Sequence, residues 1–216
     1  QPLVLPTHEA PTHRIHIQKV IEKLTEVNLK LQPSKCKFFQ REIHLLGFRI
    51  SPRGVSMDRR KLINVMSFPT PKTYKDIQRY TGLIQYFSSL IPNISTIMAP
   101  LNPLRYSKHV ATLWNKEHQT AFDNLKEALL HDTVLSFPNL QEKFYVGCDA
   151  SNVGVGILLF QKIDGETKYI SMHAKTLSKS ERNYSATKKE LLAVVYALKK
   201  FHKYLWGNHF ILYSDH

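Results

Sequence analysis

Three acidic residues in the second half of the chain occupy positions where carboxylates are uncommon. Asp149 ends the apolar run FYVGCD, Glu190 lies within NYSATKKELLAVVYAL, and Asp215 follows the apolar run FILYS. Most acids are solvated, and carboxylates held together repel one another unless a cation joins them. Clustered carboxylate oxygens suit Mg²⁺ or Mn²⁺. The three acids are therefore candidate metal ligands and catalytic residues, with two ions activating a water to hydrolyse a phosphodiester.

The segment that carries Asp149 is expected to be a strand with one apolar face. A period of two places Phe144, Val146 and Cys148 on one face, and Tyr145, Gly147 and Asp149 on the other. Gly147 leaves room beside Asp149, and the following ASNVGVG lets a backbone or a ligand approach closely.

The helix that carries Glu190 is expected to direct this residue toward the sheet. The residues aligned with Glu190 at helical spacing are small and apolar, namely Ala186, Ala193, Val194 and Ala197. The residues assigned to the solvent side are Lys188, Lys189, Lys199 and Lys200. Taken singly, each of the three acids could instead be a strand-end turn residue or a solvated helix acid. Their occurrence together on elements that could converge favours the metal site.

The order of elements in residues 133–216 predicts a mixed sheet with helices packed on it. Three strand patterns (KFYVGCD, VGVGILLFQ and KYISMHA) precede a long helix (SERNYSATKKELLAVVYALKKFHKYLWG), which returns to the strand HFILYSD. The segment GETK supplies a hairpin turn. We therefore expect an α/β or α+β domain in this half of the chain.

Residues 1–55 predict a helix followed by short strands. Ile17, Val20, Ile21 and Leu24 give an amphipathic helix from His13 to about Asn28. A short strand is expected in NLKLQP, stopped by Pro33. The segment KCKFFQREIHLLGFRIS then predicts a hairpin around QRE, with Leu46, Phe48 and Ile50 alternating on its second strand, and SPRG supplies the next turn.

Residues 56–132 predict a basic, helical region interrupted by prolines. Asp58 is a plausible cap for a helix through about Phe68, and FPTP marks a boundary after it. Two further helices are indicated by two stripes: Ile77, Tyr80, Leu83, Ile84 and Phe87, then Phe122, Leu125 and Leu129. Core packing is the expected role of the aromatic residues near position 80, which leaves Lys75 and Arg79 as candidates for contacts with nucleic-acid phosphates.

The composition favours a globular chain with a polyanionic partner. The 216 residues are 43% hydrophobic, which is enough to bury a core, and the net charge is +13. Residues 1–105 hold 16 Lys/Arg against 6 Asp/Glu, whereas residues 106–216 hold 14 against 11. Nucleic-acid binding is therefore expected mainly in the first half, although a solvated basic surface would give the same charge.

Membrane insertion and disulfide bonding are not expected. No run of about 18 apolar residues occurs, and the N-terminal segment lacks the order of a signal peptide. Cys36 and Cys148 are too few for a disulfide framework or a cysteine-based zinc site, so both are expected to be reduced. We expect an intracellular, cytoplasmic location, and both ends resemble cuts in a longer chain.

Several motifs together resemble the Pol polyproteins of gypsy-type LTR retrotransposons and retroviruses. CDAS, NYSATKKELLAVVYAL and FILYSDH resemble the ribonuclease H domain. LKLQPSKCKFFQREIHLLGFRIS is similar to the end of the reverse transcriptase palm, whereas FPTPKTYKDIQRYTGLIQYFSSLIP and APLNPL resemble the thumb and connection. The resemblance implies a division into the palm end at 1–55, the thumb and connection at 56–132, and the ribonuclease H-like domain at 133–216.

The resemblance assigns roles to individual residues. It implies that Asp149, Glu190 and Asp215 bind two Mg²⁺ (or Mn²⁺) ions, and that Leu46 and Gly47 form the hairpin that grips a primer. A fourth acid of the family would lie beyond His216, and the polymerase aspartates would fall near Gln1 and Pro2, which are not acidic. Weak or no activity is therefore expected from this chain by itself.

Two functions follow as alternatives. In the first, the chain is a fragment of a reverse transcriptase/ribonuclease H that acts on primer–template and on RNA–DNA hybrid. It recognises the hybrid by its shape and its 2′-hydroxyls. It works with the remainder of the polyprotein and is found in virus-like particles. In the second, it is a non-catalytic, domesticated or degenerate remnant that binds nucleic acid or another partner.

Overall fold

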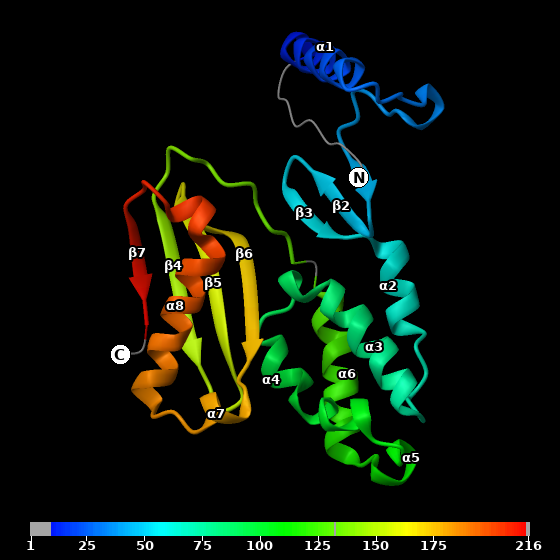
Figure 1. Ribbon diagram of the computed structural model, residues 1–216, viewed down its shortest axis with the longest axis vertical. Coiled ribbons are helices and arrows are strands. Elements are labelled where there is room, and N and C mark those ends of the chain that lie inside the picture. Colours follow the sequence, from blue (N-terminus) through cyan, green and yellow to red (C-terminus); the bar gives the residue numbers. More distant parts are fainter. Residues whose placement is uncertain (1–9, 132, 215–216) are drawn as a thin grey trace.

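Two β-sheets, each with associated helices, organise the computed structural model, which describes residues 10–131 and 133–214 (Figure 1). A small antiparallel sheet lies between the N-terminal helix and a helical region. That helical region lies beside a larger mixed sheet, which the last long helix covers. The mixed α and β composition agrees with the class expected from the sequence.

The N-terminal helix α1 (Ala10–Glu26) forms as its apolar spacing predicts. The strand expected in NLKLQP is wrong, because residues 29–32 form no regular structure and a short 3₁₀ helix, η1 (Pro33–Lys35), follows them. Leu29 and Leu31 remain 60% and 47% exposed. Without a partner strand or an apolar face to bury, the local pattern is not enough to fix a strand.

The small sheet contains the expected hairpin, but its turn lies elsewhere. Its strands, in the order β1-β2-β3, are β1 (Ile43–Leu45), β2 (Phe48–Ser51) and β3 (Gly54–Met57). The β1–β2 turn is Leu46–Gly47 and not QRE, which precedes β1. Both turn residues have positive φ, at 50° and 85°, as a two-residue hairpin turn of this hand requires. Leu46 therefore does not alternate with Phe48 and Ile50 along a strand.

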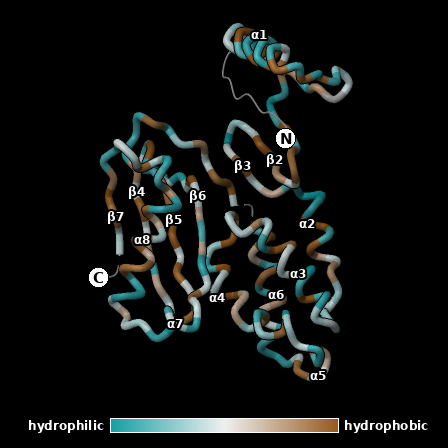
Figure 2. The backbone as a smooth tube through the Cα atoms, in the orientation of Figure 1, coloured by the Kyte–Doolittle hydropathy of each residue, from teal (hydrophilic) through white to brown (hydrophobic). Residues whose placement is uncertain are grey.

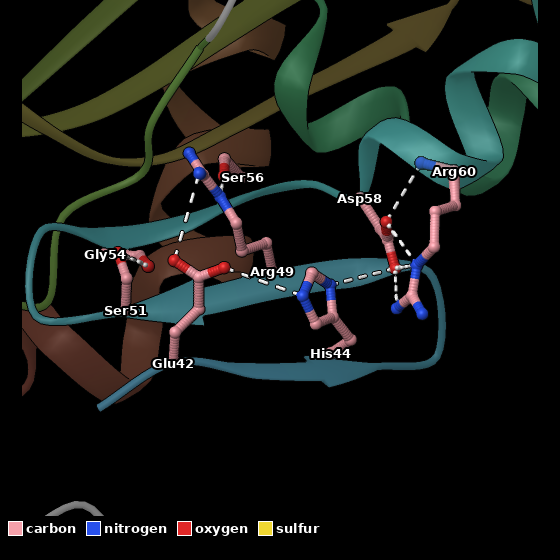
Figure 3. A network of polar contacts seen from close by, with 8 residues as sticks. All are labelled: Glu42, His44, Arg49, Ser51, Gly54, Ser56, Asp58 and Arg60. Atoms are coloured by element: carbon pink, nitrogen blue, oxygen red, sulfur yellow. Dashed lines mark hydrogen bonds and ion pairs between the residues drawn. The ribbon is translucent and has the colours of Figure 1, made fainter. Parts of the chain in front are cut away.

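Asp58 joins the small sheet to the first helix of the helical region (Figure 3). It caps α2 (Arg59–Met66) by accepting a hydrogen bond from the backbone N–H of Arg60 at 3.0 Å, as the sequence predicts. The Arg60 guanidinium also contacts the carboxylate at 2.6 Å, and His44 of β1 lies 3.0 Å from it. The hydrogen bonds of Arg60 hold the pKa of the Asp58 carboxyl well below its usual range.

The helical region surrounds an apolar core. Its other helices are α3 (Tyr74–Tyr86), η2 (Ser88–Leu90), α4 (Ile94–Met98), η3 (Ala99–Leu101), η4 (Pro103–Tyr106), α5 (Val110–Leu113) and α6 (Lys116–Leu130). The predicted stripes are largely buried, with Tyr80 and Leu125 both fully inaccessible to solvent. The hydroxyl of Tyr80 donates to the carbonyl oxygen of Phe122 at 2.9 Å, so this core residue has its polar group satisfied.

The larger sheet is mixed, in the order β6-β5-β4-β7. Its strands are β4 (Phe144–Ala150), β5 (Gly154–Ile163), β6 (Glu166–Thr176) and β7 (Phe210–Tyr213). β4 pairs antiparallel with β5 and parallel with β7, and hydrophobic residues run along the central strands β4 and β5 (Figure 2). The mixed sheet predicted from the element order is therefore present.

The two faces of the larger sheet are covered by different helices. The 20-residue helix α8 (Ala186–Leu205), preceded by the short α7 (Lys179–Arg182), packs on the face that carries Val146 and Leu159. On the other face, Met172 joins the core of the helical region. Several lysines lie along α8, and within residues 10–131 and 133–214 no helix is long and apolar enough to cross a membrane.

Candidate active site

Asp149 lies at the carboxyl end of the central strand β4, on the face predicted from the strand period. Phe144, Val146 and Cys148 are buried toward α8, whereas Asp149 is exposed. The residue paired with Asp149 on the neighbouring strand is Gly156, which adds no side chain beside the carboxylate. The space expected around Asp149 is therefore present, on both its own strand and the next.

Glu190 faces the sheet from the second turn of α8, as its apolar neighbours predict. It is 9% exposed, and its Oε1 accepts a hydrogen bond from the backbone N–H of Ala150 at 3.2 Å. Its second oxygen, Oε2, is buried and has no hydrogen-bond partner among the described residues. Because Ala150 follows Asp149 directly, the structure brings these two acids to the same end of β4.

Cys148, the residue before Asp149, has a thiol whose pKa is raised by its surroundings. Burial, with a further contribution from the charge of Glu190, raises the pKa of Cys148 to about 11. Cys148 is therefore protonated at neutral pH and is a poor nucleophile. This agrees with the expectation that Cys148 is reduced and lies on the apolar face of its strand.

The loop after β4 is held by contacts that the sequence did not reveal. Lys189 was expected in solvent, but it is 8% exposed and donates to Oδ1 of Asn152 at 2.9 Å. The correction has a simple reason, because Lys189 lies four residues before Ala193 and so also belongs to the buried side of α8. Ser151 tightens the same loop by accepting hydrogen bonds from the N–H groups of Val153 and Gly154.

Asp215 lies outside the described residues, so the third predicted ligand is not placed. β7 is parallel to β4, and the two strands pair as far as Gly147 and Tyr213. Within residues 10–131 and 133–214, no three His, Cys, Asp or Glu side chains are grouped to hold a metal ion. The described site therefore consists of two acids at one strand end, and the unpartnered Oε2 of Glu190 is a fitting donor for a cation.

A pocket lies next to Asp149, and the helical region supplies one of its walls. Asp149, Ser151, Gly154 and Gly156 line it from the sheet. Asn93, Ser95 and Thr96 line it from the start of α4. No motif in the sequence pointed to this second wall, because it depends on how the helical region packs against the sheet.

The predicted nucleic-acid-binding residues fall into two places. Leu46 is 67% exposed at the tip of the β1–β2 hairpin, and its carbonyl oxygen accepts a hydrogen bond from the Tyr86 hydroxyl. Gly47 is buried against Phe87. Lys75 and Arg79 are exposed in the first half of α3. Lys75 lies 11 positions before Tyr86 in the helix, or about 16 Å along its axis. The hairpin tip and the basic pair are thus separate surfaces.

Residues 114–212 match the family described as "RNase H-like domain found in reverse transcriptase". This match begins just before α6 and includes β4, α8 and almost all of β7. The mixed sheet and the packed helix α8 both lie largely within the matched residues, so this part of the chain is similar to the RNase H-like domain found in reverse transcriptase.

The whole chain is similar to retroelement polyproteins. It is 37% identical over 204 residues to the retrovirus-related Pol polyprotein from transposon 297 of Drosophila melanogaster, a match that covers 94% of this chain and 19% of that polyprotein. It is 32% identical over 194 residues to the transposon Tf2-3 polyprotein of Schizosaccharomyces pombe, covering 89% of this chain and 14% of the relative. The chain thus spans less than a fifth of the length of these relatives.

The fold of the chain is also similar to solved structures that share little sequence identity with it. A foamy viral protease-reverse transcriptase, determined in complex with RNA/DNA hybrid, superposes with a TM-score of 0.78 at 23% identity and covers 96% of this chain and 28% of that one. The same kind of protein in complex with double-stranded DNA gives a TM-score of 0.75. Nearly all of the chain therefore has the fold of a part of these solved structures.

Proposed function

We propose that this chain is part of a retroelement reverse transcriptase/ribonuclease H, and that its RNase H-like domain hydrolyses the RNA strand of RNA–DNA hybrids. The observation that carries the proposal is the pair at the end of β4. The exposed Asp149 precedes Ala150, whose backbone N–H donates to the buried carboxylate of Glu190. Among the described residues, the second oxygen of Glu190 has no hydrogen-bond partner. A buried carboxylate oxygen without a partner is costly unless it meets a cation.

Asp149, Glu190 and Asp215 would hold the divalent metal, Mg²⁺ or Mn²⁺. Once bound, the metal supplies an activated water and stabilises the charge on the leaving oxygen. The Ala150 N–H holds Glu190 in place, and the hydrogen bond from Lys189 to Asn152 holds the loop after β4 against α8. The buried, protonated Cys148 leaves the acids as the chemically active groups at this strand end.

The first half of the chain would bind the nucleic acid that the second half cleaves. Residues 1–105 hold the larger excess of basic residues, at 16 Lys/Arg against 6 Asp/Glu. The exposed tip at Leu46 is suited to contact a primer in the complete polyprotein, and Lys75 and Arg79 are suited to contact phosphates. RNA-directed DNA synthesis would belong to the complete polyprotein.

The substitution Asp149→Asn tests the proposed hydrolysis. In a Pol polyprotein that contains this chain, we expect it to lower Mg²⁺-dependent cleavage of a labelled RNA–DNA hybrid by roughly a hundredfold or more, because a metal ligand is lost. The matched control is Asp164→Asn, the same chemical change in the β5–β6 turn, where φ is 54° and asparagine is tolerated. This control should cleave like the wild type.

Two results would contradict the proposed hydrolysis. One is cleavage by Asp149→Asn at the wild-type rate. The other is hybrid binding by the wild-type polyprotein without any metal-dependent cleavage, which would favour the non-catalytic, nucleic-acid-binding alternative. A gel assay over a series of Mg²⁺ and Mn²⁺ concentrations, combined with a filter-binding assay, separates these outcomes.

A further inference from the structure

The pocket beside Asp149 is built from two parts of the chain that lie far apart in sequence. Gly154 and Gly156 give the sheet side a surface without side chains, and α4 approaches closely there. A Cβ atom placed on Gly154 would lie 2.8 Å from the Cβ of Ser95, which is closer than such atoms pack. The wall formed by α4 is therefore fixed against the sheet and belongs to the site in the folded protein.

Asn93 on this wall has a side chain that its own helix does not use. Asparagine at the N-cap position usually accepts a hydrogen bond from its helix, but the Asn93 side chain makes no capping bond. Its Oδ1 instead lies over the sheet, 3.6 Å from where a Cβ on Gly156 would be. Gly156 pairs with Asp149 on the neighbouring strand. The exposed Asn93 amide therefore lies beside the position of Asp149 in the sheet.

The chemistry of the α4 wall suits a sugar hydroxyl better than a phosphate. Among the described residues, those that line the pocket include no lysine or arginine, and one of them is the acidic Asp149. A phosphate oxygen can only accept hydrogen bonds, and the described lining residues offer it no cationic side chain. A ribose 2′-hydroxyl both donates and accepts, and a carboxamide does the same with its oxygen and its NH₂ group.

We propose that Asn93, contributed by the helical region, binds the 2′-hydroxyl of an RNA nucleotide next to the cleaved bond and so helps the site to distinguish RNA from DNA. This inference rests on the proposed ribonuclease function and adds a specificity-determining residue from outside the matched RNase H-like segment, residues 114–212. It also makes the site composite, because cleavage would then depend on the packing of α4 against the sheet.

Asn93→Gly tests the proposed contact in the polyprotein. Glycine removes the carboxamide and tolerates the left-handed backbone of Asn93, where φ is 52°. The matched control is Asn28→Gly, because Asn28 is also exposed and also has positive φ, at 56°. It follows α1, which lies far from α4 (Figure 1). The substrates are an RNA–DNA hybrid and a series of hybrids with a single 2′-deoxynucleotide moved across the cleavage site.

We expect Asn93→Gly to lower kcat/KM on the all-ribose strand by about 5- to 10-fold, the cost of one lost hydrogen bond. On the one hybrid that lacks the contacted 2′-hydroxyl, wild type and variant should be equal within about twofold. Asn28→Gly should match the wild type on every substrate. An Asn93→Gly loss that is the same on all the hybrids, or no loss at all, would overturn the proposal.

A binding measurement separates this inference from the proposed function. If the wild type cleaves no hybrid, the proposed function fails, and the affinities for RNA–DNA hybrid and for DNA duplex then test Asn93 directly. The inference expects the wild type to prefer the hybrid and Asn93→Gly to lose about the same 5- to 10-fold of that preference. An unchanged preference in Asn93→Gly, or no preference in the wild type, would overturn the inference.

Discussion

At the scale of single residues, the candidate site depends on one buried carboxylate with unequal surroundings. Oε1 of Glu190 has the Ala150 N–H as a partner, whereas Oε2 has none within the part of the chain that the structure describes. Buried polar atoms in native proteins are nearly always hydrogen-bonded, so an exception asks for an explanation. A metal ion bound to this oxygen would supply that explanation. Metal binding at Glu190 should then raise the free energy of unfolding.

Glu190→Gln is predicted to remove the stabilisation that metal ions give. For the wild-type chain, Mg²⁺ or Mn²⁺ at 100 times its dissociation constant should raise the free energy of unfolding by about 2.7 kcal/mol. The glutamine variant should respond far less, because its neutral amide is a poor ligand for these ions. Thermal unfolding with and without metal measures the difference.

Glu127→Gln serves as the matched control for this stability measurement. Glu127 is exposed on α6, and its conversion to glutamine changes the net charge by the same amount. It should keep the full response to metal ions. If Glu190→Gln and Glu127→Gln gained equal stability from Mg²⁺, the ions would be acting on the overall charge, and Glu190 would not be a ligand.

Residue-level predictions from the sequence were accurate where a side chain's own element decides its direction. The strand period placed Asp149, and the small residues around Glu190 placed that side chain toward the sheet. Lys189 was assigned to solvent because of its charge, although it lies four residues before Ala193 on the buried side of α8 and donates to Asn152. Asn93 was missed because its importance comes from a contact between segments far apart in sequence.

At the scale of elements, Asp58 joins β3 to α2 and also holds β1 through His44 (Figure 3). This one carboxylate therefore serves as a helix cap, an ion-pair partner of Arg60 and a cross-link within the small sheet. Leu46 and Gly47 follow β1 directly, so the position of the exposed hairpin tip depends in part on these contacts. A local helix signal in the sequence thus has a consequence for a predicted binding surface.

Asp58→Ala is predicted to lower the free energy of unfolding by about 1–2 kcal/mol, because the α2 cap is lost. Asp58→Asn should keep the cap and lose only the charge, so it isolates the contribution of the carboxylate charge that Arg60 and His44 contact. Hydrogen bonds from Arg60 lower the pKa of the folded Asp58 carboxyl. The charge therefore stabilises the fold above the unfolded pKa of about 3.9, and this stability is lost as the pH falls below that value.

Urea unfolding at pH 7 and at pH 2.5 checks the sign of this effect. The advantage of wild type over Asp58→Asn should be largest at pH 7 and should shrink at pH 2.5, because the Asp58 carboxyl of the unfolded chain takes up a proton there. An advantage of equal size at both pH values would mean that the Asp58 charge does not stabilise the fold. Asp58→Ala should remain less stable than Asp58→Asn at both pH values, because the cap is needed at both.

The wrong predictions for NLKLQP and for the hairpin turn have a common cause, which is the pairing of strands. The strand expected in NLKLQP has no neighbour to bond with, and the hairpin expected around QRE turns at Leu46–Gly47 instead. The pattern of apolar residues does not show which run pairs with which, and the positive φ of Leu46 is unusual for its residue type. Helices were predicted better, because their hydrogen bonds are local.

At the scale of the whole molecule, the larger sheet is shared by two cores. Its α8 face holds one core, and its other face contributes Met172 to the core of the helical region. A β-bridge between Val55 and Leu135 also connects the small sheet to the segment that leads into β4. The position of α4, and with it the second wall of the pocket, is therefore set by contacts between regions that the sequence suggested were separate domains.

Gly154→Ala is predicted to weaken this junction. The added Cβ would meet the Ser95 Cβ at 2.8 Å and the carbonyl oxygen of Lys175 at 2.9 Å, and neither is the flexible end of a long side chain. Relieving the clash would push α4 away from the sheet, so we expect the free energy of unfolding to fall by about 1–3 kcal/mol, as overpacked sites do. Chemical denaturation measures the change.

Gly82→Ala gives the opposite result if close packing is the cause. A Cβ on Gly82 would meet nothing within 4 Å, and the residue lies inside α3, where alanine favours the helix. This control should raise the free energy of unfolding by about 0.5–1 kcal/mol.

Adding Ser95→Gly to Gly154→Ala should restore part of the loss, since it removes one of the two clashing groups. If the double variant were no more stable than Gly154→Ala, the contact between α4 and the sheet would not be what Gly154 protects, and the composite pocket would lose its structural basis.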